Sequence, residues 1–475
     1  MHVTSPAFKQ NARQALADAG LQKALSNART GFVEKRARAV AALPEFEALR
    51  EQGRDLKNHV LAHLDFYLDT YARAVEANGG TVHWCETADD ARRAVVEICR
   101  AAGARTVTKG KSMVGEELGI NEHLEAAGIE PVETDLGEYI IQLRKEPPSH
   151  IIAPAIHLNR EDWIEAFREK HRELPAGRHL DERKTLIDEA RAVLRSRFLA
   201  ADVGITGANM LIAETGSSVI VTNEGNGDLT QTLPKVHIVL ASVEKVVPTL
   251  EDACTILRLL ARSATGQDFS TYTTFSTGAR RPGDLDGPGE YHVILLDNGR
   301  TSMIGTEFQE MLRCIRCAAC MNHCPVYGAV GGHAYGWVYP GPMGSVLTPS
   351  LIGVDKAGHL PNASTFCGRC ESVCPMKIPL PKMMRHWRER EFERHLSPSA
   401  ARTGLRSWAW FARRPWAYRL AARLGAGVLG FAGRKRGRFG SLPLAGGWTG
   451  GRDMPAPEGE TFQARYARLK KQGLV

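Results

Sequence analysis

Two cysteine-rich stretches, CIRCAACMNHCP at residues 314–325 and CGRCESVCP at residues 367–375, determine the kind of domain formed in this part of the 475-residue chain. In the first stretch the cysteines have the spacing C-x2-C-x2-C-x3-C, and a proline follows the last one. This spacing is typical of bacterial ferredoxins, where three thiolates bind three irons of one cluster and the fourth thiolate binds another cluster. The pattern predicts an α-helical, ferredoxin-like domain with two iron–sulfur clusters.

The second stretch has one cysteine fewer than the first. Aligned on the prolines, its cysteines match the last three of the first stretch, and Ser364 takes the position of Cys314. Because the last thiolate of each run binds the other run's cluster, two unequal ligand sets are predicted. The first cluster is expected to be bound by Cys314, Cys317, Cys320 and Cys374, and the second by Cys324, Cys367 and Cys370.

The four-cysteine set fits a [4Fe–4S] cluster. The three-cysteine set leaves two alternatives open. It could bind a [4Fe–4S] cluster with one iron held by water, by Ser364 or by a ligand from a partner, or it could bind a [3Fe–4S] cluster.

Other uses of the cysteines fit the pattern less well. Structural zinc usually takes four ligands from two C-x2-C pairs. A secreted disulfide framework would follow a signal peptide, and the first twenty residues lack an apolar region. Cys85, Cys99 and Cys254 stand alone and are expected to be buried and inert. His323 is expected to tune the field around a cluster or to face solvent.

Composition and charge narrow the remaining functions. The formal charge is +8, with much of the excess near the C-terminus and no nucleic-acid recognition motif, so nucleic acid is not an expected partner. Anionic metabolites, an acidic partner or a membrane headgroup layer explain the charge equally well. No apolar run approaches the roughly 20 residues of a transmembrane helix. We therefore expect a cytoplasmic protein, with peripheral contact at the inner face of the membrane left open.

Hydrophobic periodicity divides the chain into four parts. Residues 51–300 carry short apolar runs, among them an expected strand at 217–223. These runs alternate with helical segments, and a charged, helix-like interval lies at 159–199. The alternation predicts an α/β domain with a parallel sheet covered on both faces. The other parts are a helical segment at 1–50, the two-cluster domain at 303–390, and a basic, Trp-rich region of helical and irregular structure at 396–475. In the last region, Trp and Arg residues between Trp408 and Arg423 suggest an interfacial helix, a partner-docking surface or ordinary packing.

The α/β part also contains Gly-, Ser- and Thr-rich turns, at residues 108–117, 204–209 and 213–218. Such turns can offer backbone N–H groups to an anion, helped by Lys109 and Lys111, or they can be ordinary connections between strand and helix. None has the spacing of a dinucleotide or Walker motif, so a nicotinamide, nucleotide or flavin cofactor is unsupported. Glu214 could act chemically in its turn, but a solvated turn residue is the simpler interpretation.

The whole chain resembles the lactate utilization protein B family. The likeness rests on residues 107–143, 201–226, 314–344 and 365–381, and it extends through the Trp-rich region. It implies an α/β domain similar to the sugar-isomerase and CoA-transferase-like fold. It also implies an iron–sulfur subunit that works with two other subunits in a complex oxidising L-lactate to pyruvate. The same seven cysteines carry over as cluster ligands, and Ser364 fits the family pattern.

These observations lead to one main hypothesis and two alternatives. The main hypothesis is an electron-relay subunit, non-catalytic or co-catalytic, that passes electrons through two clusters to an unidentified acceptor. One alternative is a catalytic dehydrogenase subunit for a 2-hydroxy acid such as glycolate, with substrate at the three-cysteine cluster. The other is a redox or iron sensor. No catalytic residue is assigned, and the residues do not indicate which acid or which subunit binds it.

Overall fold

The computed structural model describes residues 3–443 and 445–474, without the side chains of residues 28–30. Two compact units are present, Met1–Arg390 and Glu391–Val475. The finer division of the first unit at residues 50 and 300 stays a prediction. The chain combines an α/β domain, a cysteine-rich region and a helical C-terminal region, as the sequence predicted.

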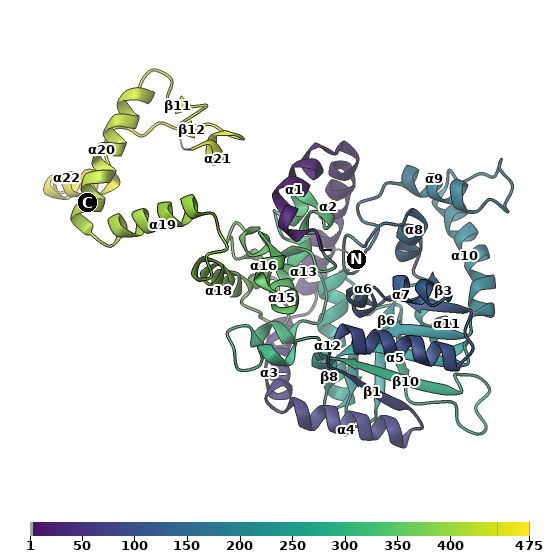
Figure 1. Ribbon diagram of the computed structural model, residues 1–475. Helices are drawn as coiled ribbons and strands as arrows, with labels where there is room; N and C mark the ends of the chain where they lie inside the picture. Colours follow the sequence, from purple (N-terminus) through teal and green to yellow (C-terminus); the bar gives the residue numbers. More distant parts are fainter. Residues whose placement is uncertain (1–2, 444, 475) are drawn as a thin grey trace. The chain divides into compact units, whose positions relative to one another are not determined.

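A six-stranded parallel sheet forms the centre of the first unit, with the strand order β1-β10-β7-β4-β2-β3 (Figure 1). Its strands are β1 (Thr81–Cys85), β2 (Thr106–Gly110), β3 (Glu130–Glu133), β4 (Val203–Gly207), β7 (Val236–Ser242) and β10 (Glu290–Leu296). The predicted α/β fold with a parallel sheet is thereby confirmed. Because all strands run the same way, their carboxyl ends lie along one edge.

The helices of this unit follow the alternation of strands and turns. They are α1 (Phe8–Ala17), α2 (Ala19–Ala41), α3 (Phe46–Ala62), α4 (Leu64–Ala77), α5 (Ala88–Ala101), α6 (Met113–Leu118), α7 (Ile120–Ala126), α8 (Leu136–Arg144), α9 (Arg160–Lys170), α10 (Arg183–Ala200), α11 (Asn226–Thr232), α12 (Leu250–Ala264), α13 (Ala319–Asn322), α14 (Tyr327–Val330), α15 (Gly341–Ile352), α16 (Val354–Ala357), α17 (Arg369–Ser372) and α18 (Leu380–Glu393). Short 3-10 turns are η1 (Ser5–Ala7), η2 (Val243–Lys245), η3 (Thr301–Met303), η4 (Gln309–Arg313), η5 (His333–Tyr335) and η6 (Leu360–Asn362).

Helices cover both faces of the parallel sheet. Successive side chains of a strand point to opposite faces, so one strand contributes side chains to the apolar clusters on both sides. On β10, Val293 and Leu295 join the apolar cluster that contains α4, whereas Ile294 joins the cluster that contains α5, α6 and α7. A capping box at Thr87 starts α5, where the Thr87 hydroxyl accepts a hydrogen bond from the Asp90 N–H. Burial on both faces explains the long apolar runs of β7 and β10.

A second, smaller sheet has the order β8-β5-β6-β9 and is mixed. Its strands are β5 (Met210–Ile212), β6 (Ser217–Thr222), β8 (Val246–Val247) and β9 (Tyr272–Ser276). The expected strand at 217–223 is therefore present, but it pairs antiparallel with β5 and β9 outside the parallel sheet. Gly216 makes the tight turn between β5 and β6 at a φ of +66°, where a Cβ atom would lie 2.5 Å from the Val75 backbone nitrogen.

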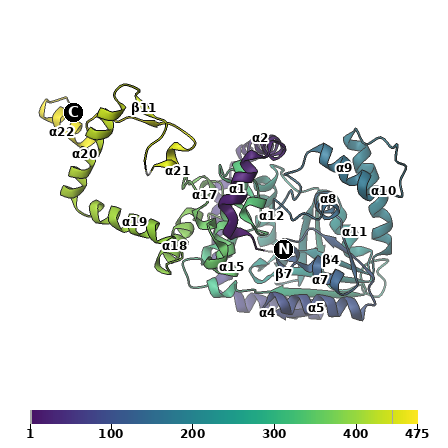
Figure 2. The same cartoon turned by 45° about the horizontal axis from the view of Figure 1, so that its top comes forward.

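Helices α8, α9 and α10 build a side lobe with its own core (Figures 1 and 2). Phe167 of α9 and Leu194 of α10 are buried in this core together with Tyr139 of α8. The charged, helix-like interval predicted for residues 159–199 corresponds to α9, α10 and the loop between them.

The N-terminal helices pack against the cysteine-rich region as well as against the α/β domain. The Ser5 hydroxyl donates to the Tyr335 carbonyl at 2.9 Å, and the Gln22 amide donates to the Ala329 carbonyl at 2.9 Å. Residues of α1, α3, α12 and the cysteine-rich region share one large apolar cluster. The first fifty residues thus form part of the covering of the predicted cluster domain.

The second unit contains α19 (Ser399–Ala412), α20 (Pro415–Gly433), β11 (Arg438–Phe439), α21 (Gly446–Thr449), β12 (Met454–Pro455) and α22 (Phe462–Lys471). Trp408, Trp410 and Trp416 are exposed in this unit. The Arg414 guanidinium lies 4.4 Å from the centroid of the Trp410 ring. The three roles suggested for this Trp- and Arg-rich segment stay predictions. Within the described residues, no helix is long and apolar enough to cross a membrane.

A buried ion network joins the α/β domain to the loop between the first two cysteines. Arg300, which follows β10 and is fully buried, donates to both oxygens of Glu117 on α6 at 3.0 and 2.6 Å. Its Nε atom also lies 3.2 Å from Glu244, which pairs at 3.2 Å with Arg316. Tyr339 donates to Glu117 at 2.6 Å. Burial raises the pKa of Glu244, but the guanidinium groups of Arg300 and Arg316 outweigh it and lower this pKa to about 2.

We expect Arg300→Leu to destabilise the iron-loaded protein by about 3–5 kcal/mol, because it leaves Glu117 and Glu244 as buried charges with too few partners. The midpoint of urea unfolding, followed by circular dichroism, measures the effect. The matched control is Arg197→Leu, which removes an exposed pair with Glu130 and should cost about 1 kcal/mol or less. Equal midpoints for the two variants would contradict the importance of the network.

Candidate functional site

The two cysteine runs have the same backbone conformation at an offset of fifty residues. Arg316 and Ala318 flank Cys317 with φ angles of +60° each, and Phe366 and Gly368 flank Cys367 with φ angles of +53° and +76°. Left-handed backbone is uncommon for residues other than glycine, so its recurrence at matching positions marks a functional loop. A single helical turn follows each loop, α13 in the first run and α17 in the second.

The structure brings the seven cysteines together in two groups. The thiols that act electrostatically on Cys317 are Cys374 and Cys314, and those that act on Cys370 are Cys324 and Cys367. The resulting four-thiol group is Cys314, Cys317, Cys320 and Cys374, and the three-thiol group is Cys324, Cys367 and Cys370. These groups have the same members as the predicted ligand sets, and iron binding by them stays a prediction.

The two groups are adjacent. Cys320 belongs to the four-thiol group, yet its neighbours also include Cys370 of the three-thiol group. Burial raises the pKa of Cys317 and of Cys370 to about 12. At neutral pH such thiols hold their protons unless a cation replaces them, as iron does in a cluster.

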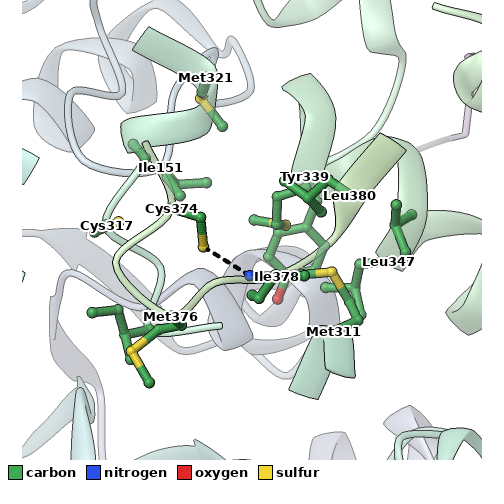
Figure 3. Packing of buried hydrophobic residues seen from close by; sticks show 14 of the residues in the cluster. Ile151, Met311, Cys317, Met321, Tyr339, Leu347, Cys374, Met376, Ile378 and Leu380 are labelled. Carbon is green, nitrogen blue, oxygen red and sulfur yellow. Dashed lines mark hydrogen bonds between the residues drawn. The ribbon is translucent and has the colours of Figure 1, made fainter. Parts of the chain in front are cut away.

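Backbone N–H groups point at several of the sulfur atoms. Ile378 N–H donates to Cys374 Sγ at 3.5 Å (Figure 3). The Ala319 N–H partly offsets the effect of burial, which raises the pKa of Cys317, and the Arg369 N–H lowers the pKa of Cys367. Hydrogen bonds to the sulfurs are one of the means by which proteins stabilise iron–sulfur clusters and set their potentials. The thiols, the amides and the loop conformation therefore fit iron–sulfur clusters.

A mononuclear metal site has a different geometry. In the part of the chain that the structure describes, no three His, Cys, Asp or Glu side chains lie close enough together to hold one metal ion. The ligands of a single zinc ion lie about 2 Å from it. In a cubane cluster each thiolate binds a different iron, so the thiolates lie farther apart.

The three-thiol group lies at the protein surface. Cys367 is exposed, whereas Cys370 is buried. Cys324, Cys367 and Cys370 line a small cavity together with Ser364. The Ser364 hydroxyl accepts a hydrogen bond from the Phe366 N–H at 3.1 Å, so it holds the loop in place beside these thiols.

Two arginines from the N-terminal helices approach the four-thiol group. Arg36 of α2 is buried and donates to the Val373 carbonyl at 2.9 Å, and it acts electrostatically on Cys317 and Cys374. Arg50 of α3 donates to the Cys374 carbonyl through two nitrogens at 3.0 and 2.7 Å. Neither arginine could be recognised from the sequence, because nothing distinguishes them from the other charged residues of these helices.

The remaining cysteines and His323 have ordinary surroundings. Cys85 and Cys99 are buried, as predicted, but Cys254 is exposed, so its predicted burial is wrong. Cys254 lies on α12 between the buried Ala253 and Thr255, on a face that points away from the core. His323 Nδ1–H donates to the Ala319 carbonyl at 2.9 Å, and burial lowers the pKa of this histidine.

A cavity lies beyond the carboxyl ends of the parallel strands. The turns at 108–117 and 204–209 both line it, whereas the turn at 213–218 does not. Lys111 lines it, but the prediction that Lys109 is available to an anion is wrong. The Lys109 ammonium is buried and pairs with Glu116 at 2.5 Å and Glu133 at 2.7 Å.

Two more cationic residues line the cavity, Lys245 and Arg316, and the sequence analysis did not single them out. A signal for Lys245 was present, since it interrupts the apolar run that follows β7. Glu214, considered as a chemical residue, instead accepts a hydrogen bond from the Leu250 N–H at 2.7 Å at the start of α12.

Comparison with known proteins gives these features a family context. Residues 68–296 match the LUD domain family, and residues 310–378 match the 4Fe-4S dicluster domain family. The chain is thus an iron–sulfur protein that joins a LUD domain to a dicluster domain.

Relatives of similar length define the family further. The chain is 41% identical to lactate utilization protein B of Macrococcus caseolyticus, over 100% of this chain and 99% of the relative. It is 40% identical to lactate utilization protein B of Bacillus subtilis, over 98% and 97%. It is also 39% identical to the uncharacterized electron transport protein YkgF of Escherichia coli, again over 98% and 97%. The chain belongs to the lactate utilization protein B family.

A solved structure, described as a DUF162 family protein from Deinococcus radiodurans, aligns with 49% of this chain and 98% of its own length. The TM-score is 0.27 and the identity 12%, and so weak a likeness supports no argument.

The exposed thiols Cys254 and Cys367 provide a test of iron binding. Under anaerobic treatment of the iron-loaded protein with iodoacetamide, we expect alkylation of Cys254 and protection of Cys367, because a thiolate bound to iron is not free to react. Removal of iron with a chelator should expose Cys367, whose pKa is lowered by the Arg369 N–H. Peptide mass spectrometry measures both sites. Equal alkylation of the two cysteines in the loaded protein would rule out Cys367 as a ligand.

Proposed function

We propose that this chain is the iron–sulfur electron-relay subunit of a complex that oxidises L-lactate to pyruvate. The observation that carries the proposal is the assembly of seven thiols into two adjacent groups, of four and of three members. The names of its relatives, lactate utilization protein B and electron transport protein, support the metabolic role.

Two iron–sulfur clusters supply one-electron redox chemistry when they are bound. The four-thiol group would hold a [4Fe–4S] cluster, and the three-thiol group would hold a [4Fe–4S] or a [3Fe–4S] cluster. The chain's own residues stabilise the negative charge: backbone N–H groups face the sulfurs, and Arg36 and Arg50 lie beside the four-thiol group.

The two groups differ in exposure at one thiol. Cys367 of the three-thiol group is exposed, whereas every thiol of the four-thiol group is buried or of intermediate exposure. An acceptor or a partner subunit can therefore approach the three-thiol group at the surface. Electrons would enter through the buried group and leave through the exposed one.

Partners are part of the proposal. Oxidation of a 2-hydroxy acid releases two electrons, whereas each cluster carries one, so a site that pairs them must exist elsewhere in the complex. Two other subunits of the lactate utilization system would supply that site, with an electron acceptor not identified by these residues. Thiols that must stay reduced favour the cytoplasm.

We expect Cys320→Ala and Cys370→Ala each to remove iron from one group and to abolish lactate oxidation by the assembled complex. Iron and sulfide analysis, EPR and a lactate-dependent assay measure the effects, and Cys254→Ala serves as the control with normal values. Circular dichroism should stay unchanged, because the parallel sheet has a core of its own. Full lactate oxidation by a variant that has lost its iron would end the relay proposal.

The number of irons distinguishes the two types of second cluster. About eight irons per chain, with EPR signals only after reduction, would indicate two [4Fe–4S] clusters. About seven irons, with a signal in the oxidised protein, would indicate a [3Fe–4S] cluster at the three-thiol group. A chain purified anaerobically without iron would contradict both.

Arg36 provides a second, independent test. We expect Arg36→Met to lower the reduction potential of the four-thiol cluster, because a nearby positive charge stabilises the reduced form. Potentiometric titration followed by EPR measures the shift, and the exposed Arg100→Met is the control. An unchanged potential in a variant with normal iron content would show that Arg36 does not act on this cluster.

A further inference from the structure

The cavity beyond the parallel sheet has the position of a ligand site. It has a volume of about 490 Å³ and lies where Lys111 follows β2, Ala208 follows β4 and Lys245 follows β7. Ligands of parallel α/β sheets bind at the carboxyl ends of the strands. Arg316 and Tyr339 of the cysteine-rich region line the same cavity. It therefore lies between the sheet edge and the four-thiol group.

Lys245 is the unusual residue of this cavity. It is only 7% exposed, and its ammonium forms no hydrogen bond or ion pair with any part of the chain that the structure describes. Two other lysines have direct partners: the buried Lys57 donates to the Glu244 carbonyl, and the half-buried Lys111 pairs with Asp135 at 3.4 Å. Glu244 and Cys314 favour its charge only from a distance. A buried ammonium without a direct partner is costly, which indicates that an anion in the cavity completes the site.

The residues around Lys245 indicate the chemical class of that anion. Arg316 lines the cavity beside it, with its guanidinium 4.9 Å from the Tyr339 ring centroid. Apolar side chains, including Ile220 and Leu260, form other parts of the wall. A cationic end and an apolar wall suit a small organic acid, with its carboxylate at Lys245 and Arg316 and its carbon chain on the apolar side.

Acidic residues near Lys111 limit the anion to the other end of the cavity, at Lys245 and Arg316. Asp135 and Glu224 also line it, and both lie near Lys111. Asp135 pairs with Lys111 and caps α8, where its Oδ1 atom accepts the Gly137 N–H at 3.0 Å. Glu224 accepts the Leu136 N–H at 3.3 Å. A second negative group on the ligand would therefore be repelled at the Lys111 end of the cavity. The site thus favours a monocarboxylate over a dicarboxylate.

The cationic end also adjoins the predicted first cluster. Lys245 and Arg316 are both electrostatic neighbours of Cys314. A carboxylate bound by these two residues lies beside the four-thiol group, and not at the exposed three-thiol group.

We propose that this cavity binds the 2-hydroxy acid or its 2-oxo product, with the carboxylate held by Lys245 and Arg316. The identity of the acid rests on the proposed function, whereas the site itself rests on the cavity and its cations. The relay subunit then contributes the groups that bind the carboxylate of the acid, while the site that pairs the two electrons stays with the other subunits.

The test is anaerobic calorimetric titration of pyruvate, and separately of L-lactate, into the full-length, iron-loaded chain. We expect binding to the wild-type chain and at least about tenfold weaker binding to Lys245→Met, because a charge-assisted hydrogen bond is lost. Lys184→Met, which alters an exposed lysine paired with Asp188, is the control and should bind as wild type does.

Two further measurements separate binding from folding. Ala208→Leu keeps all charges but narrows the cavity, so it should also weaken binding at least about tenfold. Lys245→Met should keep or raise the thermal midpoint, since it removes a buried charge that has no direct hydrogen bond or ion pair in the described chain. A marked fall in the midpoint would instead assign Lys245 a structural role and overturn the proposal.

The outcomes also separate this inference from the relay. No heat from either acid at millimolar concentration, in a chain with full iron and normal EPR, overturns the binding site and leaves the relay intact. A chain that binds pyruvate but holds no iron overturns the relay and leaves the site. Inorganic phosphate that binds as tightly as pyruvate would overturn the assignment to a carboxylic acid.

Discussion

The buried ion network of Arg300, Glu117, Glu244 and Arg316 is the interaction on which the arrangement of the first unit depends. Four charges taken out of water are stable only when each has close partners, so the network fixes its members within narrow limits. Glu117 lies on α6, which follows β2, and Glu244 lies on η2, which follows β7. Arg316 belongs to the loop between the first two cysteines. The network therefore sets the position of the cysteine loop relative to the sheet.

This constraint links the α/β domain to the redox chemistry. Arg316 has a left-handed backbone, takes part in the network and lines the cavity beyond the sheet. One side of the loop faces the thiols and the other faces the cavity. A cationic, partly apolar cavity thus lies beside the predicted buried cluster, while the three-thiol group opens to the surface. The N-terminal helices complete the enclosure, since Arg36 and Arg50 bind the backbone of the second cysteine run.

The fold class could be predicted from sequence because its signals are local. Apolar runs alternate with helices, and proline-terminated cysteine runs have a spacing that few other structures use. The prediction of strand 217–223 was right about the strand and silent about its sheet, because pairing is decided by the tight turn at Gly216. The expectation for Cys254 was wrong because a single cysteine does not reveal which face of its helix is buried.

By itself the sequence determined the parallel α/β architecture and the two cysteine runs, since spacing along the chain governs short loops. Its two ligand sets stay a prediction. Only the tertiary structure decided which charged side chains are neutralised by a partner and which face the cavity. Lys109 and Lys245 are both buried, yet only packing shows that two carboxylates neutralise Lys109 while Lys245 meets a cavity. Arg36 comes to lie beside Cys374 only through the folding of residues far apart in sequence. The electrostatic effect of a charged side chain depends on its partners and its burial, and neither can be read from the local sequence.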